Sequence, residues 1–188
     1  MLDNILSFNR KPKDIETVLL PHINMLFKVA YQYTGQYTDA EDLVQELLAD
    51  MIDKQQQLFK AKNVKAWLMK CLYHKFVDTY HKTKHLSLVD SNDDPRIVSL
   101  SALQTEMDEQ VLTAQVLNCM KSLSANHRAV VSLHDINGMT LREISDIMDK
   151  PIGTLKSDLH RARQQIKKFM KLQVDDLSTG HINERGIL

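Results

Sequence analysis

Glycine and proline are scarce in this 188-residue chain, and their scarcity argues for helices. There are five glycines and four prolines, and the apolar residues mostly recur at three- and four-residue spacing, which is typical of α-helices. Hydrophobic residues make up 43% of the chain, an ordinary share for a globular protein and too high for general disorder. We therefore predict an all-α fold.

Cysteine is equally scarce, and long apolar runs are missing. Cys71 and Cys119 lie far apart and form no CxxC pair, as expected of free thiols in a reducing cytosol. No apolar run approaches the roughly 20 residues that span a bilayer. The N-terminus lacks the sustained apolar core of a signal peptide. We expect a cytoplasmic protein without direct membrane insertion.

The common motifs of enzymes are also missing. The chain has no glycine-rich phosphate loop, no HExxH and no nucleophile elbow, so we expect no catalytic residue and no cofactor. Cys71 and His74 are spaced as C-x-x-H, which leaves a metal site as an alternative. Cys71 also belongs to an apolar stripe, and this favours an ordinary core thiol. No metal is therefore expected.

The formal net charge is zero, but the charges are segregated along the chain. Residues 38–53 carry acids and no Lys or Arg, residues 54–84 are strongly basic, and a second basic stretch covers residues 153–171. Segregation of this kind indicates separate surfaces for separate partners.

Periodicity divides the chain into two small helical domains. Residues 14–84 form the first. We predict a helix that is interrupted at Pro21 and capped at its C-terminus by Gly35, a capping box at Thr38 and Glu41, and Asn63 as the cap of a later helix. Periodicity disappears after about residue 84, so residues 85–105 are predicted to be a flexible linker. The second domain covers residues 106–172, and residues 173–188 read as a polar tail.

The second domain ends in a helix-turn-helix pattern. Thr140 and Glu143 form another capping box before a short amphipathic helix, and Pro151 and Gly153 lie in the break that follows. The last helix then carries its apolar residues at three- and four-residue spacing and turns its basic residues outward. A short helix, a turn and a longer basic helix are typical of DNA-binding domains.

Three segments together resemble one family. LSANHRAVVSLHDINGMTLREISDIMDKPIGTLKSDLHRAR resembles the C-terminal DNA-binding region of a bacterial extracytoplasmic-function (group 4) RNA polymerase sigma factor. LFKVAYQYTGQYTDAEDLVQELL resembles the polymerase-binding region of the same family, and VKAWLMKCLYHKFVDTYHK its promoter-melting region. The likeness covers roughly residues 16–84 and 108–170, in the family's order.

The resemblance implies partners and roles for particular residues. The implied partners are core RNA polymerase, through its β′ clamp helices and β flap, promoter DNA, and an anti-sigma factor that restrains the protein until stress. Polymerase binding would fall to Asp39, Glu41, Asp42, Gln45 and Glu46. Recognition of the −10 element would fall to Lys60, Lys62, Asn63, Lys65, Lys70, His74 and Lys75. Recognition of the −35 element would fall to Thr154, Lys156, Ser157, Asp158, His160, Arg161 and Arg163.

Two positions depart from the family pattern. His74 stands where many relatives carry Asn, and an imidazole offers different hydrogen bonds to a base. Asp158 stands where relatives usually carry a basic residue, and a carboxylate near phosphates weakens DNA binding. We expect altered base preference at the first position and weakened or retuned −35 binding at the second. Trp67 shares an apolar stripe with Val64 and Leu68 and is expected in the core.

A helix-turn-helix regulator that binds operator DNA without polymerase is the main alternative. It accounts for the second domain but leaves the acidic segment 38–53 and the basic segment 54–84 without a role. A scaffolding protein, which would have no affinity for DNA, is the weakest alternative.

Overall fold

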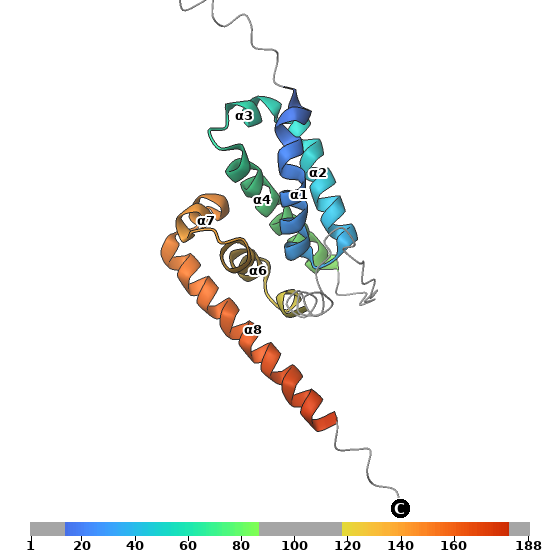
Figure 1. Ribbon diagram of the computed structural model, residues 1–188, viewed down its shortest axis with the longest axis vertical. Coiled ribbons are helices and arrows are strands. Elements are labelled where there is room, and N and C mark those ends of the chain that lie inside the picture. Colours follow the sequence, from blue (N-terminus) through green and yellow to red (C-terminus); the bar gives the residue numbers. More distant parts are fainter. Residues whose placement is uncertain (1–13, 87–117, 181–188) are drawn as a thin grey trace, which may run out of the picture.

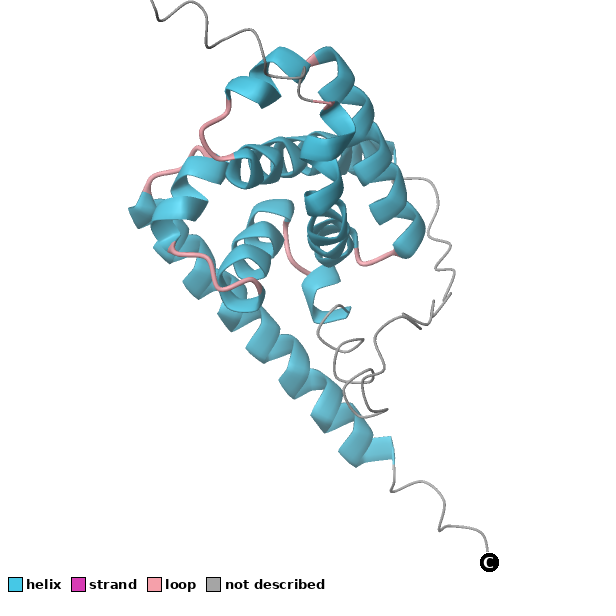
Figure 2. Ribbon diagram, turned by 45° about the horizontal axis from the view of Figure 1, so that its top comes forward, coloured by secondary structure: helices cyan, strands magenta, loops and turns pink. Residues whose placement is uncertain are grey.

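The computed structural model describes residues 14–86 and 118–180, and every regular element within them is a helix (Figures 1 and 2). The first unit consists of α1 (Ile15–Thr34), α2 (Tyr37–Asp53), α3 (Gln55–Lys60) and α4 (Val64–Leu86). The second unit consists of α6 (Ala125–Val131), the π-helical η1 (Ser132–Ile136), α7 (Leu141–Met148) and α8 (Ile152–Gly180). The all-α prediction is confirmed. The predicted linker lies outside the described residues, apart from the end of α4.

Helix α1 runs through Pro21 without a break, so the predicted interruption is wrong. Proline removes one backbone donor, but buried side chains on both sides of it, Leu19 and Leu26, hold the helix against the core. The end of α1 is as predicted: Gly35 adopts φ 74°, a left-handed conformation that glycine tolerates. Its N–H donates to the carbonyl of Tyr31 at 2.8 Å.

The two predicted capping boxes have different outcomes. Helix α2 begins at Tyr37 after Gln36, which makes no side-chain cap hydrogen bond, so the box predicted at Thr38 is wrong. At the start of α7, the Thr140 hydroxyl accepts from the N–H of Glu143 at 3.3 Å, and the Glu143 carboxylate accepts from the N–H of Thr140 at 2.8 Å. That box is confirmed. The predicted cap of α4 is also present, since the Asn63 side chain accepts from the N–H of Ala66 at 3.0 Å.

Helices α7 and α8 form the predicted helix-turn-helix, joined by a three-residue break. Helix α7 ends at Met148, and the C-cap residue Asp149 adopts the left-handed conformation with φ 52°. Helix α8 runs to Gly180, beyond the point at which a polar tail was expected, and its C-terminal half projects away from the body of the molecule (Figure 1).

The two units pack against each other and share one continuous core. Helices α6 and α7 and η1 lie against α1 and α4 (Figure 1). The ring of Tyr33 stacks on that of Phe76 at a centroid distance of 4.8 Å near this junction. Trp67 is partly buried against the core, as expected. The helical units predicted from the sequence are present, and their cores meet.

Candidate nucleic-acid interface

The acidic residues of α2 lie on its solvent-facing side. Leu43, Val44 and Leu47 are buried, and their spacing turns the predicted polymerase-binding residues Asp39, Glu41, Asp42, Gln45 and Glu46 outward, where all five are exposed.

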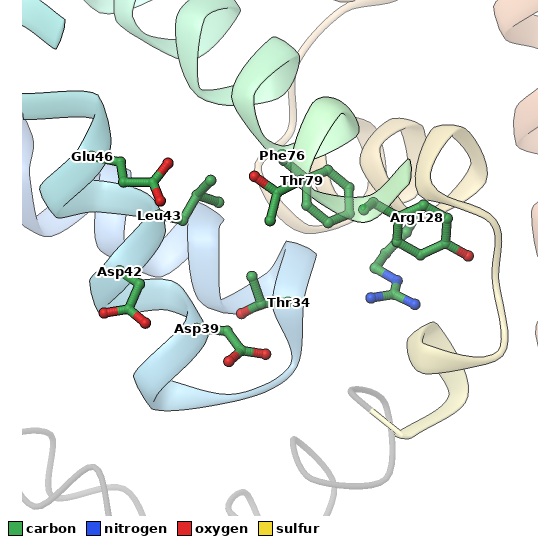
Figure 3. Close-up of a pocket in the computed structure, with 9 residues that line it drawn as sticks. Thr34, Asp39, Asp42, Leu43, Glu46, Phe76, Thr79 and Arg128 are labelled. Carbon is green, nitrogen blue, oxygen red and sulfur yellow. The ribbon is translucent and has the colours of Figure 1, made fainter. Parts of the chain in front are cut away.

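Three of these acids, Asp39, Asp42 and Glu46, line a cavity of about 310 Å³. Figure 3 shows them on α2, facing Phe76 and Thr79 of α4, with Arg128 of α6 at the far end. Partial burial at the cavity raises the pKa of Asp39, and the charge of Asp42 raises it further. The cavity therefore combines concentrated negative charge with a position at the junction of the two units.

Lysine 75 connects two of the predicted sets. Its ammonium group lies 3.2 Å from the Glu46 carboxylate and 3.3 Å from that of Asp50, and only 19% of its side chain is exposed. A residue predicted to bind DNA is therefore paired with one predicted to bind polymerase. In this arrangement Lys75 shapes the acidic face of α2 and does not present a free charge.

The end of α3, the loop after it and the start of α4 present basic side chains to solvent. Lys60, Lys62 and Lys65 are exposed and have no ion pair among the described residues. Asn63 is exposed as well, but its side-chain oxygen is used to cap α4. This stretch can therefore offer three exposed lysines to an anionic ligand.

Further along α4, Lys70 and His74 bind a residue of the second unit. The Asp149 carboxylate accepts from the Lys70 ammonium through one oxygen and lies 3.1 Å from the His74 ring nitrogen through the other. The hydrogen bond from Lys70 lowers the pKa of Asp149, and the interaction with His74 adds to this effect. Asp149 was not singled out from the sequence. Only its place between the two helices of the helix-turn-helix could have drawn attention to it.

The predicted −35 residues lie on α8, and most of them face solvent. Leu155, Leu159 and Ala162 are buried, and this orients Thr154, Lys156, Ser157, His160 and Arg161 outward. Arg163 forms a two-point ion pair with Asp135, with its Nε at 3.0 Å from one carboxylate oxygen. That pair raises the pKa of Arg163 and fixes its side chain against η1.

Asp158 points inward, in contrast to its neighbours. Its carboxylate lies 3.4 Å from the Lys150 ammonium and 3.8 Å from the His127 ring nitrogen, and 13% of its side chain is exposed. The carboxylate thus joins α8 to the preceding break and to α6.

Arg128 is a buried cation that was not singled out from the sequence. It is 6% exposed and donates to the carbonyls of Tyr33 at 2.6 Å, Lys121 at 2.8 Å and Leu123 at 3.3 Å. Its Nε has no hydrogen-bond partner within the described parts of the chain. Burial lowers the pKa of Arg128. Its place among apolar neighbours in the segment ANHRAVV is the signal that could have identified it.

A second cavity, of about 390 Å³, is predominantly apolar and lies between η1 and α8. Its apolar lining includes two exposed side chains, Ile136 and Met170. Arg163 and Lys167 lie at its edge beside Asp135. A groove of this composition suits an apolar segment of another protein.

No candidate for a metal site or a membrane span was found in the part of the chain that the structure describes. Within residues 14–86 and 118–180, no three His, Cys, Asp or Glu residues are grouped so that they could hold a metal ion. No described helix is both long and apolar enough to cross a bilayer. Cys71 is half-buried, and partial burial raises the pKa of its thiol.

Comparison with known families gives two matches that correspond to the two units. The model "Sigma-70 region 2" matches residues 19–85, and "Sigma-70, region 4" matches residues 113–166. Together they span well over half of the chain.

Three curated relatives illustrate the likeness. The chain is 27% identical to the ECF RNA polymerase sigma factor SigM of Bacillus subtilis over 164 residues, which cover 86% of this chain and 98% of SigM. It is 26% identical to SigL of Mycobacterium tuberculosis over 147 residues, covering 78% of this chain and 82% of SigL. It is 26% identical to SigE of Mycolicibacterium smegmatis over 151 residues, which are 79% of this chain but only 58% of SigE.

Solved structures agree with this fold. The sigma factor RpoE in complex with the anti-sigma factor NepR from Bartonella quintana superposes with a TM-score of 0.68 at 25% identity, covering 85% of this chain and 98% of that one. CnrH in complex with the cytosolic domain of CnrY superposes with a TM-score of 0.59, covering 84% and 88%. At 17% identity, this second likeness concerns the fold alone.

Proposed function

This chain belongs to the extracytoplasmic-function sigma factors of the sigma-70 family, and we propose that it binds core RNA polymerase and directs it to promoters through the −10 and −35 elements. One observation carries the proposal: an exposed acidic face on α2 and an exposed basic face on α8 occur in one chain. An operator-binding regulator needs only the second. The chain itself makes and breaks no covalent bond, because nucleotide addition belongs to the core enzyme.

The acidic face of α2 is the proposed polymerase contact. Asp39, Glu41, Asp42, Gln45 and Glu46 would dock on the β′ clamp helices. Clustered carboxylates on an exposed helix attract a basic partner over several ångströms and fix its orientation. Asp42 is exposed and forms no ion pair in the described structure. A substitution there therefore changes the charge of the acidic face without breaking an ion pair.

The N-terminal half of α8 is the proposed −35 reader. A recognition helix enters the major groove with its first turns, where Lys and Arg reach guanine acceptors and Ser reaches either base or phosphate. Lys156, Ser157 and Arg161 are exposed on this part of α8 and fit that role. The capping box at Thr140 and the short break after α7 hold the helix at the angle of a helix-turn-helix.

The loop before α4 and the helix itself form the proposed −10 surface. Melting a promoter requires unstacking of bases, at a cost of a few kcal/mol that protein contacts must offset. Lys60, Lys62 and Lys65 are exposed there and would bind the backbone of the displaced strand.

Two further partners are proposed for the second unit and for the chain as a whole. The apolar cavity between η1 and α8 would receive a segment of the β flap, which is the family's expected contact. An anti-sigma factor would hold the chain inactive, since the similar sigma factor RpoE is described in complex with the anti-sigma factor NepR.

Transcription from genomic DNA tests the whole proposal. The purified chain would be mixed with core RNA polymerase and fragmented DNA of its source, and transcript starts would be sequenced. We expect discrete starts that share −10 and −35 elements. Specific DNA binding without any dependence on core polymerase would instead favour the operator-binding regulator.

A further inference from the structure

Asp158 is the one acidic residue in the part of α8 that is proposed to read DNA, and it is turned away from the reading face. Lys156 and Arg161 on the same turns are exposed, whereas only 13% of the Asp158 side chain is exposed. Its carboxylate faces the Lys150 ammonium at 3.4 Å and the His127 ring nitrogen at 3.8 Å. In this arrangement Asp158 is bound within the protein and is not presented to DNA with its neighbours.

Lys150 lies in the break between α7 and α8 and is bound on both sides of it. Its carbonyl accepts from the Ser145 hydroxyl of α7 at 2.6 Å, and its N–H donates to the Ser145 carbonyl at 3.3 Å. Its ammonium donates to the Asp158 carboxylate of α8 at 3.4 Å. A single residue therefore ties the end of the first helix of the helix-turn-helix to the second turn of the other helix. This connection restricts the angle between the two helices.

His127 of α6 makes a second connection to α8. Its Nδ1 lies 3.2 Å from the Gln165 side-chain oxygen, and its Nε2 lies 3.8 Å from the Asp158 carboxylate. Asp158 and Gln165 are seven positions apart, and about two turns of α-helix bring such residues to the same side. The imidazole, with 17% of its side chain exposed, thus spans two turns of α8. Rotation of α8 about its axis would break both contacts.

The polar contacts restrain α8 in a way that its apolar packing does not. Leu155, Leu159 and Ala162 are buried, but the hydrophobic effect has no preferred direction, whereas hydrogen bonds do. Base edges are read through side chains that must be placed accurately. Contacts to phosphate carry no sequence information directly. Loss of the polar contacts should therefore reduce discrimination between sequences more than it reduces affinity for DNA in general.

We propose that Asp158, Lys150 and His127 position α8 for the reading of DNA. They set the angle and the rotation at which the helix presents Lys156 and Arg161 to base edges. Related sigma factors usually carry a basic residue at the position of Asp158, so this chain has an internal bond in place of a possible DNA contact. The inference rests on the proposed function, because it takes α8 to be the helix that reads DNA.

The test measures how well the full chain distinguishes DNA sequences in the absence of polymerase. A preferred site is first selected from random-sequence duplex DNA with the wild-type chain. The affinities for that site and for a scrambled duplex of the same composition then give a specificity ratio for each variant. Lys150→Ala and Asp158→Asn should each lower this ratio about fivefold. The double variant should lower it no further, because both substitutions remove the same bond.

Other variants separate the contributions. His127→Ala removes the longer contact and should lower the ratio about twofold; an unchanged ratio would exclude α6 from the positioning of α8. Asp146→Asn and Lys171→Ala are the matched controls at exposed positions of α7 and α8, and both should keep the wild-type ratio. Lys150→Arg should keep it as well, because arginine can still pair with Asp158. Asp158→Asn preserves the shape of the side chain, so it decides the question if Lys150→Ala fails to fold.

Several results would overturn the inference. If Lys150→Ala weakens binding to both duplexes by the same factor, Lys150 only contacts phosphate. Additive losses in the double variant would mean that Lys150 and Asp158 act separately. A wild-type chain that selects no site would remove the reading role of α8 and the positioning role with it.

The outcome is independent of the test of the proposed function. If the variants lose discrimination but the chain never directs core polymerase to discrete starts, the proposed function fails and the positioning of α8 stands. If the chain directs polymerase and Lys150→Ala and Asp158→Asn discriminate as well as the wild type, the proposed function stands and the positioning role fails.

Discussion

Helices α4 and α8 both carry basic residues, but those of α4 are more often held by carboxylates. On α4, Lys70 and His74 are bound to Asp149, and Lys75 is bound to Glu46 and Asp50. On α8, Lys156, His160 and Arg161 are exposed without an ion pair in the described structure. The comparison teaches that basic composition indicates a nucleic-acid surface, whereas tertiary contacts decide whether that surface is free.

The largest expected effect comes from reversing charge on α2, which would separate the role of the first unit from that of the second. Asp42→Lys should weaken capture of core polymerase by roughly tenfold or more, because it opposes an otherwise complementary basic partner. Binding of −35 DNA to the isolated chain should be unchanged. Pull-down with core polymerase measures the effect, and Asp53→Lys, at the other end of α2, is the matched control. Equal capture by both variants would remove α2 from the docking surface.

The next effect concerns the residue that joins the units. Arg128→Ala should lower the free energy of unfolding by about 2–3 kcal/mol, because three buried carbonyls lose their donor. Urea unfolding followed by circular dichroism measures this change. Arg142→Ala, at an exposed position of α7, should stay within about 0.5 kcal/mol of the wild type. If Arg128→Ala is equally mild, the buried arginine does not hold the junction.

The third expected effect is on DNA binding by α8. Asp158→Arg should tighten binding of −35 DNA and steepen its salt dependence by about one unit, because it adds a cation to the proposed DNA-binding part of α8. Repulsion from Lys150 should turn the new side chain outward. Titrations at several salt concentrations measure both quantities. Asp158→Asn removes the inward ion pairs alone, and a salt slope equal to that of Asp158→Arg would exclude a phosphate contact.

The smallest expected effect is on stability, and it concerns the two sequences that were predicted to be capping boxes. Thr140→Ala should destabilise the second unit by about 1 kcal/mol, the usual cost of losing an N-cap. Thr38→Ala should cost far less, since the Thr38 side chain caps no helix. Thermal unfolding of both variants measures the difference. Equal losses would mean that Thr38 stabilises α2 by another route.

Much of the fold could be predicted from local patterns. Apolar spacing predicted the helices, Gly35 and Asn63 predicted helix ends, and the Thr140–Glu143 box predicted the start of α7; the structure confirms each of these. The errors at Pro21 and Thr38 have different causes. Packing of α1 outweighs a missing backbone donor, and α2 begins at Tyr37, upstream of the box that its sequence suggests.

Part of the candidate site could also be predicted from the sequence, and part could not. The outward faces of α2 and α8 follow from helical periodicity, and the structure places their polar residues where the sequence suggests. Their binding roles remain predictions. The inward turn of Asp158 and the capture of Lys75 by Glu46 depend on neighbours from other helices, which periodicity does not specify.

The amino-acid sequence by itself determined the helices, the segregation of charge and the resemblance to sigma factors, because these depend on residues a few positions apart. Only the tertiary structure decided that Arg128 would reach Tyr33 and that Asp149 would bind Lys70, 79 positions away. Contacts at such separations form when apolar faces of two helical units pack together. Those faces bring distant charges within hydrogen-bond reach, and that proximity pairs Lys70 and His74 of α4 while it leaves Lys156 of α8 exposed.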